Sequence, residues 1–214
     1  TTTSDALWAG VPTITMAGRQ FAARVSASIL KAVGLPEDTD MGNSEVGHNA
    51  IGCGRVFAQG ASLIDDAIAS RALFEGKVWN ELVKNAITQA STLHFIGLLS
   101  DGKVHSNINH LEAMLREAKT QGVRSVRLHA LTDGRDVPPV SALDYVDRIE
   151  AILEELSSDG FDYCIASGGG RMKITMDRYD ADWPMIERGW QTHVRGEGRF
   201  FSSMSTAIET FRNE

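Results

Sequence analysis

Three polar segments carry the side chains best suited to binding or transforming an anion. The segments are SDGKVHS at 100–106, TDGRDVPP at 132–139 and SGGGRMKITMDR at 167–178. His105 and Asp136 can move protons, whereas Arg135 and Arg171 present planar forks of N–H donors that match carboxylate or phosphate. Asp-Gly is also a common turn dipeptide, and Ser or Asp often caps a helix, so structural turns remain an alternative for each segment. Three such segments together favour a pocket for an anionic substrate.

A fourth segment, MGNSEVGHNA at 41–50, places a serine between two glycines. In a sharp turn at the start of a helix, the hydroxyl of Ser44 would be exposed and the helix N-terminus would favour an arriving anion. The alternative is an N-cap formed by Asn43 or Ser44. A capping box is absent, because Val46 and Gly47 stand where it needs Glu or Gln. The residues alone leave nucleophile and cap as open alternatives.

The glycine-rich stretches match no nucleotide-binding motif. Neither GxxxxGK followed by Ser or Thr nor GxGxxG between a strand and a helix occurs in the sequence. The three glycines at 168–170 could instead let the backbone approach a ligand closely and expose N–H groups to an anion.

The elements that must position these side chains alternate between strand and helix from residue 92 onward. Apolar runs of strand length occupy 92–99, 125–131 and 161–166, and helical patterns occupy 107–121 and 141–157. This βαβαβ order predicts an α/β fold with a parallel sheet flanked by helices. Ligands bind at the carboxyl ends of the strands in such sheets, and each polar segment follows a strand. The three segments are therefore expected at one edge of the sheet.

The pattern before residue 92 is weaker. Helices are expected at 61–73 and 78–90, and a further helix at 20–33 is followed by a loop-like composition over 34–54. The apolar face of the helix at 78–90 would consist of Leu82, Val83, Ala86 and Ile87. A domain boundary is expected between residues 54 and 74, because the regular alternation begins only after it.

Composition excludes several classes of protein. The 214 residues are 43% hydrophobic and 23% charged, as in ordinary globular proteins, and the net charge of −7 argues against a nucleic-acid binder. The basic residues comprise 15 Arg and 6 Lys. This excess of arginine fits an anion-binding site, but thermal history or codon bias would produce the same ratio. No apolar run is long enough to span a membrane, and no secretory signal opens the chain, so the cytosol is expected. Cys53 and Cys164 form no CxxC pair and indicate neither a redox site nor structural zinc.

The polar segments together resemble the cofactor-independent phosphoglycerate mutases, most closely the plant and trypanosomatid-like branch. The matching segments are MGNSEVGH at 41–48, LLSDGKVHS at 98–106, TDGRDVPP at 132–139 and SGGGRMKITMDRY at 167–179. The resemblance implies a fold of the alkaline-phosphatase-like superfamily. Residues 1–58 would belong to its metal-binding domain, and residues 59–214 to its substrate-binding phosphotransferase domain, incomplete at the C-terminus.

The family interconverts 3-phosphoglycerate and 2-phosphoglycerate through a phosphoserine enzyme, without 2,3-bisphosphoglycerate as a cofactor. The resemblance implies that Ser44 accepts the phosphoryl group and contacts one of two divalent metal ions. These ions are expected to be Mn²⁺, with Mg²⁺ or Co²⁺ as alternatives, and their other ligands are expected outside this chain.

The resemblance also assigns the substrate contacts. His105 and Arg135 would bind substrate, and Asp136 would handle the proton of the glycerate hydroxyl. Arg171 and Arg178 would grip the carboxylate and the phosphate. A monomeric, cytoplasmic enzyme of glycolysis and gluconeogenesis is implied, with a small-molecule substrate and neither a nucleic-acid nor a membrane partner.

The sequence also departs from the family. The Asp and His metal ligands and a later NFRxDR motif are absent, residues 1–30 match poorly, and Lys103 stands where many relatives have glycine. We therefore expect a partial chain with little or no mutase activity alone. Two alternatives remain: a phosphatase-like hydrolase on the same scaffold, in which water accepts the phosphoryl group, and a non-catalytic anion-binding module.

Overall fold

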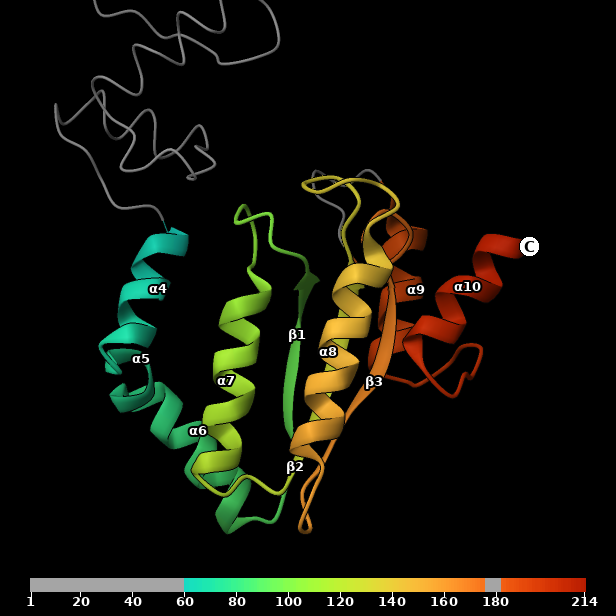
Figure 1. The fold of residues 1–214 in the computed structure, drawn as a ribbon. Coiled ribbons are helices and arrows are strands. Elements are labelled where there is room, and N and C mark those ends of the chain that lie inside the picture. The colour runs from blue at the N-terminus through green and yellow to red at the C-terminus, as the bar shows by residue number, and fades with distance from the viewer. Residues whose placement is uncertain (1–59, 176–181) are drawn as a thin grey trace, which may run out of the picture. The chain divides into compact units, whose positions relative to one another are not determined.

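Three parallel strands form the sheet in the part of the chain that this computed structural model describes, residues 60–175 and 182–214. The strands are β1 (Leu93–Leu99), β2 (Ser125–Thr132) and β3 (Asp162–Gly170), in the order β1-β2-β3. At their carboxyl ends Leu99 pairs with Thr132, and Thr132 pairs with Gly170, so the strands end at one edge (Figure 1). The predicted parallel sheet with flanking helices is confirmed.

The two crossover helices, α7 (Ile108–Thr120) and α8 (Ala142–Leu156), lie side by side over one face of the sheet (Figure 1). The Asn107 side chain begins α7 by accepting a hydrogen bond from the Asn109 N–H at 2.9 Å. The apolar faces of both helices are buried against the sheet, through residues that include Ile108, Leu115, Ala118, Val146, Ile149, Ile152, Leu153 and Leu156. Burial of these side chains, which removes apolar surface from water, fixes the helices over the strands.

The prediction of a single helix at 61–73 is wrong, because two helices occupy this stretch, α4 (Gly60–Ala69) and α5 (Ala72–Glu75). Arg71 separates them with a left-handed backbone, at φ 66°. Its guanidinium reaches across to α7 and donates a hydrogen bond to Glu117 at 2.6 Å. The tertiary ion pair and the local bond from the Ser70 hydroxyl to the Asp66 carbonyl, at 2.7 Å, accompany the break.

Helix α6 (Lys77–Thr88) confirms the helix expected at 78–90, but half of its expected apolar face is wrong. Val83 and Ala86 are buried, whereas Leu82 and Ile87 are 51% and 44% exposed. Trp79 takes their place in the core and packs edge to face on Phe74. The buried face of α6 therefore includes Trp79, which the predicted face had left out.

Strand β3 is longer than expected and includes the three glycines. The pairing with β2 skips Ala166, so that Ser167 lies opposite His129 and the glycines lie opposite the end of β2. A Cβ on Gly169 would lie 2.4 Å from the Ile174 side chain, and one on Gly168 would lie 2.8 Å from the Met204 side chain. Neighbouring side chains therefore pack closely on these two glycines, and the close approach to a ligand that the sequence suggested stays a prediction.

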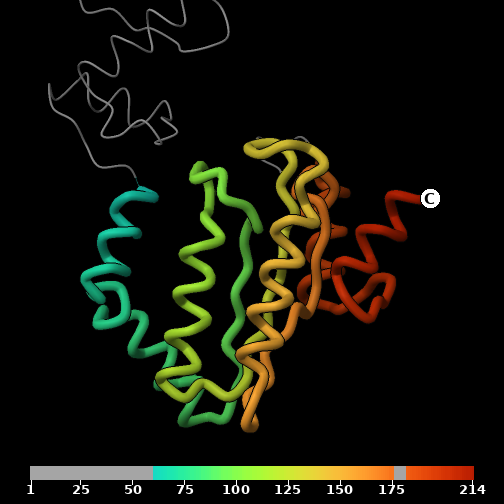
Figure 2. The backbone as a smooth tube through the Cα atoms, in the orientation of Figure 1, coloured from blue at the N-terminus to red at the C-terminus, as the bar shows by residue number. Residues whose placement is uncertain are grey.

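Two further helices follow β3 along the chain, α9 (Trp183–His193) and α10 (Met204–Asn213) (Figure 2). Helix α9 packs against β3, and α10 packs against α8. No helix in residues 60–175 and 182–214 is long and apolar enough to cross a membrane. The helix expected at 20–33 and the loop expected at 34–54 lie outside the described residues.

Candidate functional site

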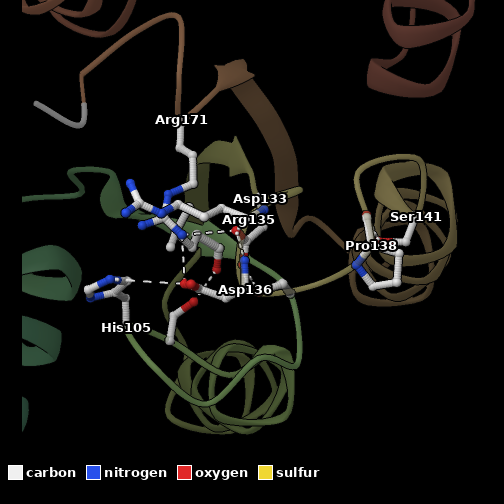
Figure 3. A network of polar contacts seen from close by, with 10 residues as sticks. His105, Asp133, Arg135, Asp136, Pro138, Ser141 and Arg171 are labelled. Carbon is white, nitrogen blue, oxygen red and sulfur yellow. Dashed lines mark hydrogen bonds and ion pairs between the residues drawn. The ribbon is translucent and has the colours of Figure 1, made fainter. Parts of the chain in front are cut away.

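The loops that leave the three strands meet at the carboxyl edge of the sheet, as the sequence predicted. Figure 3 shows His105 from the loop after β1, Asp133, Arg135 and Asp136 from the loop after β2, and Arg171 directly after β3. Parallel pairing causes this convergence, because it brings strand ends that are distant in sequence to the same edge.

Asp133 lies at the centre of the cluster, with a side chain only 1% exposed. Its Oδ2 accepts a hydrogen bond from the Ser100 hydroxyl, at the end of β1, at 2.7 Å. Its Oδ1 accepts the backbone N–H groups of Arg135 and Asp136, each at 3.1 Å. The same oxygen accepts Nη1 of Arg171 at 2.9 Å. One carboxylate is thus bonded to the segments that follow all three strands.

Arg171 is buried between two carboxylates. Its Nη1 donates to Oδ1 of Asp133 and, at 2.6 Å, to Oδ2 of Asp136, and its side chain is 5% exposed. Burial of a guanidinium is costly without such partners, and two charge-assisted bonds compensate for it.

The bonds outweigh burial in setting the charge of this cluster. Burial by itself raises the pKa of Asp133, but hydrogen bonds from Ser100, Arg171 and two backbone N–H groups hold that pKa below its ordinary value. Burial likewise disfavours the charged form of Arg171, yet its bonds to the two aspartates raise the pKa of the guanidinium. Asp133 and Arg171 are therefore both charged at neutral pH.

His105 and Arg135 form the accessible side of the site. His105 is 49% exposed, and its Nε2 lies 4.0 Å from Oδ2 of Asp136. Arg135 is exposed, and within the described ranges its guanidinium has no ion-pair partner. Arg135 can accordingly offer its donors to an incoming anion without first giving up a carboxylate.

Backbone geometry brings the first two loops into contact. A Cβ on Gly102 would lie 3.0 Å from the Cβ of Asp136, so glycine allows the loop after β1 to approach that residue. The next residue, Lys103, has a left-handed backbone at φ 56°, which glycine adopts without strain. This backbone conformation fits the glycine that the resemblance led us to expect at this position.

Two of the residues assigned by resemblance, Ser44 and Arg178, lie outside the described residues. Across residues 60–175 and 182–214, no group of three or more His, Cys, Asp or Glu side chains could hold a metal ion. The described residues therefore do not fit a metal site, and the expected metal contact of Ser44 stays a prediction.

Sequence reasoning missed two residues of the cluster, Asp133 and Ser100. Both belong to segments that it did select, but turn and cap chemistry explains an Asp-Gly pair and a serine after a strand equally well. The partners that distinguish them are distant in sequence, because Ser100 is 33 residues and Arg171 is 38 residues from Asp133. An aspartate directly after a buried strand was the available signal.

Sequence reasoning also missed a histidine cluster, which lies on the face of the sheet opposite to α7 and α8. Nδ1 of His94 lies 2.9 Å from Nε2 of His129, and the Ser167 hydroxyl lies 2.6 Å from His129 Nδ1 and 2.7 Å from Nδ1 of His193. Burial lowers the pKa of both His129 and His193. This cluster links β1, β2, β3 and α9, away from the loops that carry His105 and Asp136.

Two family models match the sequence. The model described as BPG-independent PGAM N-terminus matches residues 64–214, which contain every element from α5 to α10. A model of glycosyl transferase family 41 matches residues 1–112 and overlaps the first from residue 64 to 112. Similarities that cover about 86% of the chain decide between the two.

Several curated relatives of high identity are named as phosphoglycerate mutases. A probable 2,3-bisphosphoglycerate-independent phosphoglycerate mutase of Leptospira interrogans is 58% identical over 86% of this chain and 34% of its own length. The mutases of Trypanosoma brucei brucei and Zea mays are 52% and 50% identical over 86% and 85% of this chain, and 33% and 32% of their own. The chain thus spans about a third of the length of these relatives, and their similarity extends over most of residues 1–112 as well.

A solved structure agrees with the relatives. The structure of Leishmania mexicana phosphoglycerate mutase at low cobalt concentration matches with a TM-score of 0.79 and 54% identity, over 85% of this chain and 33% of that one. The parallel sheet with flanking helices fits the alkaline-phosphatase-like fold that the resemblance implied. The motifs, the family model, the relatives and the fold agree, and the chain belongs to the family of 2,3-bisphosphoglycerate-independent phosphoglycerate mutases.

Proposed function

We propose that this chain provides the substrate-binding part of an enzyme that interconverts 3-phosphoglycerate and 2-phosphoglycerate. The enzyme would be an isomerase of the intramolecular phosphotransferase type, independent of 2,3-bisphosphoglycerate. The observation that carries the proposal is the convergence of His105, Asp136 and Arg171 from three loops, with the guanidinium of Arg135 accessible beside them.

Each of these side chains has a role that its surroundings support. Arg135, exposed, would make the first bidentate contact with the carboxylate or phosphate of the substrate. Asp136, whose side chain is 15% exposed, would exchange the proton of the glycerate hydroxyl as the phosphoryl group leaves or returns. His105, partly exposed beside Asp136, would donate a hydrogen bond to the same substrate.

The phosphoserine step is proposed for Ser44. The bond between phosphorus and the glycerate oxygen would break as the bond to the Ser44 hydroxyl oxygen forms, and the reverse transfer would return the group to the other glycerate hydroxyl. Two divalent ions, Mn²⁺ in preference to Mg²⁺ or Co²⁺, would be held by Ser44 and ligands beyond these 214 residues. Arg178 would add a third guanidinium to those of Arg135 and Arg171, and the protein would act as a cytoplasmic monomer.

Calorimetry with 3-phosphoglycerate on the 214-residue chain tests the substrate site. Arg135→Ala is expected to weaken binding about tenfold or more, because charge-assisted hydrogen bonds contribute roughly 1.5–3 kcal/mol each. Arg195→Ala is the matched control, because Arg195 is 62% exposed and pairs with Glu197. Equal affinities for wild type and Arg135→Ala would remove Arg135 from the site.

Product analysis separates the mutase from the hydrolase on the same scaffold. A mutase that contains this chain would convert 3-phosphoglycerate to 2-phosphoglycerate, whereas a hydrolase would release inorganic phosphate; ³¹P NMR resolves the two. Mass spectrometry of the metal-loaded protein after exposure to substrate is expected to find phosphate on Ser44. Inorganic phosphate as the main product, or phosphate that persists in Ser44→Ala, would refute the proposed reaction.

A further inference from the structure

We propose that Asp133 is the positioning residue of this site, which holds the guanidinium of Arg171 and the Arg135–Asp136 loop in their substrate-binding arrangement with help from Ser100. This inference rests on the proposed function, because the groups that Asp133 orients are those assigned to substrate. It gives a role to Asp133 and Ser100, which lie within the quoted motifs but to which the resemblance had assigned none.

The bonding of Asp133 supports a role in orientation. Its two oxygens accept four hydrogen bonds, from the Ser100 hydroxyl, the backbone N–H groups of Arg135 and Asp136, and Nη1 of Arg171. The two backbone bonds fix the turn that carries the proposed substrate-binding side chains. The side chain is 1% exposed, so solvent does not compete for these bonds.

The orientation of Arg171 follows from the same contacts. The bonds of its guanidinium to described residues are made by Nη1, which donates to Asp133 and Asp136 together. Because a guanidinium is planar, fixing Nη1 between two carboxylates also fixes the direction of the edge formed by Nε and Nη2. Among the described residues no acceptor bonds to that edge, so in the proposed site it would present two donors to an anion.

Charge alone would make Asp133 unfavourable at an anion site. A buried carboxylate repels an incoming carboxylate or phosphate, so a purely electrostatic effect would make its neutralisation tighten binding. A positioning role gives the opposite result when the hydrogen bonds are lost. The sign of the change in affinity therefore distinguishes the two roles.

Calorimetry with 3-phosphoglycerate and with inorganic phosphate measures this sign. Asp133→Ala removes the charge and the hydrogen bonds, whereas Asp133→Asn removes the charge but keeps an acceptor oxygen and can donate to the Ser100 oxygen. Ser100→Ala removes one bond without changing the charge. Asp159→Asn is the control, because Asp159 is exposed in the turn before β3, at the opposite end of the strands from Asp133.

Positioning predicts that Asp133→Ala weakens binding of 3-phosphoglycerate about tenfold or more and that Ser100→Ala weakens it about fivefold, since hydrogen bonds contribute roughly 1 kcal/mol and more when charged. The affinity of Asp133→Asn for 3-phosphoglycerate should stay within about threefold of that of the wild type, because asparagine has the same shape and keeps an acceptor oxygen. The affinity of Asp159→Asn should be unchanged. Tighter binding in both Asp133 variants, or unchanged binding in Asp133→Ala and Ser100→Ala, would overturn the proposal. If Asp133→Ala fails to fold, the Asn and Ser100 variants decide.

A readout without substrate separates this proposal from the proposed function. In ¹⁵N NMR spectra of the free chain, the backbone amides of Arg135 and Asp136 and the guanidinium N–H of Arg171 should shift in Asp133→Ala and much less in Asp133→Asn. If wild type binds neither anion but these shifts appear, the proposed substrate is wrong and the positioning role stands. If it binds and the shifts are absent in a folded Asp133→Ala, the positioning role is wrong.

Discussion

Replacing Arg171 by methionine would leave two carboxylates, Asp133 and Asp136, buried close together without their countercharge. Their side chains are 1% and 15% exposed, and Arg171 bonds them at 2.9 and 2.6 Å. Removing one partner of a buried ion pair costs about 3–5 kcal/mol, and methionine preserves much of the side-chain volume. That loss is a large part of the roughly 5–15 kcal/mol that stabilises a typical domain.

The loss should depend on pH in a defined direction. In the wild type the pKa of Asp133 lies below its ordinary value of 3.8, so its contribution to stability is present above that value and is lost as the pH falls through the folded pKa. Without Arg171, burial should raise the pKa of Asp133 above the ordinary value. The folded variant then binds a proton before the unfolded chain does, and its deficit shrinks as the pH falls.

Urea unfolding followed by circular dichroism, at about pH 7 and about pH 4.5, measures both effects as a difference from wild type at each pH. Arg116→Met is the matched control. Arg116 also bonds two carboxylates, Glu112 and Glu155, but it is 41% exposed and should cost no more than about 1 kcal/mol. A loss in Arg171→Met equal to that of the control, or identical at both pH values, would refute the reasoning.

Three other predictions follow from the same structure. Gly189→Ala should destabilise the fold by about 1–3 kcal/mol, although it replaces a glycine inside α9, because the new Cβ would lie 2.8 Å from the Thr175 backbone nitrogen. Thermal unfolding measures this loss. Gly198→Ala is the control and should leave stability unchanged, because no atom lies within 4 Å of its Cβ position. Burial lowers the pKa of His129 and His193, so the unfolded chain binds protons at a higher pH than the folded chain does. The free energy of unfolding, measured with urea, should therefore fall as the pH drops below about 6.5. His129→Gln should make this dependence on pH weaker. The 214-residue chain with Mn²⁺ should convert 3-phosphoglycerate no faster than buffer by ³¹P NMR, because it spans only about a third of the length of its mutase relatives, and turnover above the buffer rate would contradict this.

The periodicity of the sequence predicted the regular elements well where one apolar face meets the sheet. The helix expected at 107–121 is observed as Ile108–Thr120, and the strand expected at 125–131 as Ser125–Thr132. Prediction failed where a tertiary contact overrode the local pattern. Arg71 leaves the helical conformation while its guanidinium pairs with Glu117, and Trp79 replaces Leu82 in the core.

The sequence predicted which loops form the site, but not which hydrogen bonds and ion pairs connect their side chains. Strand order and parallel pairing sufficed to place His105, Arg135, Asp136 and Arg171 at one edge. Nothing in the sequence showed that Arg171 is buried between two carboxylates while Arg135 is exposed, because both arginines follow strands and both stand near aspartates.

The sequence by itself determined the α/β alternation, the parallel sheet, the family, and the loops that bear the chemistry. These follow from local periodicity and from short motifs, which need no knowledge of distant contacts. The tertiary structure alone decided the accessibility of each group and the direction of the pKa shifts of Asp133 and Arg171. Asp133 and Arg171 are 38 residues apart, and only folding places them within 2.9 Å and away from water, where their charges stabilise each other.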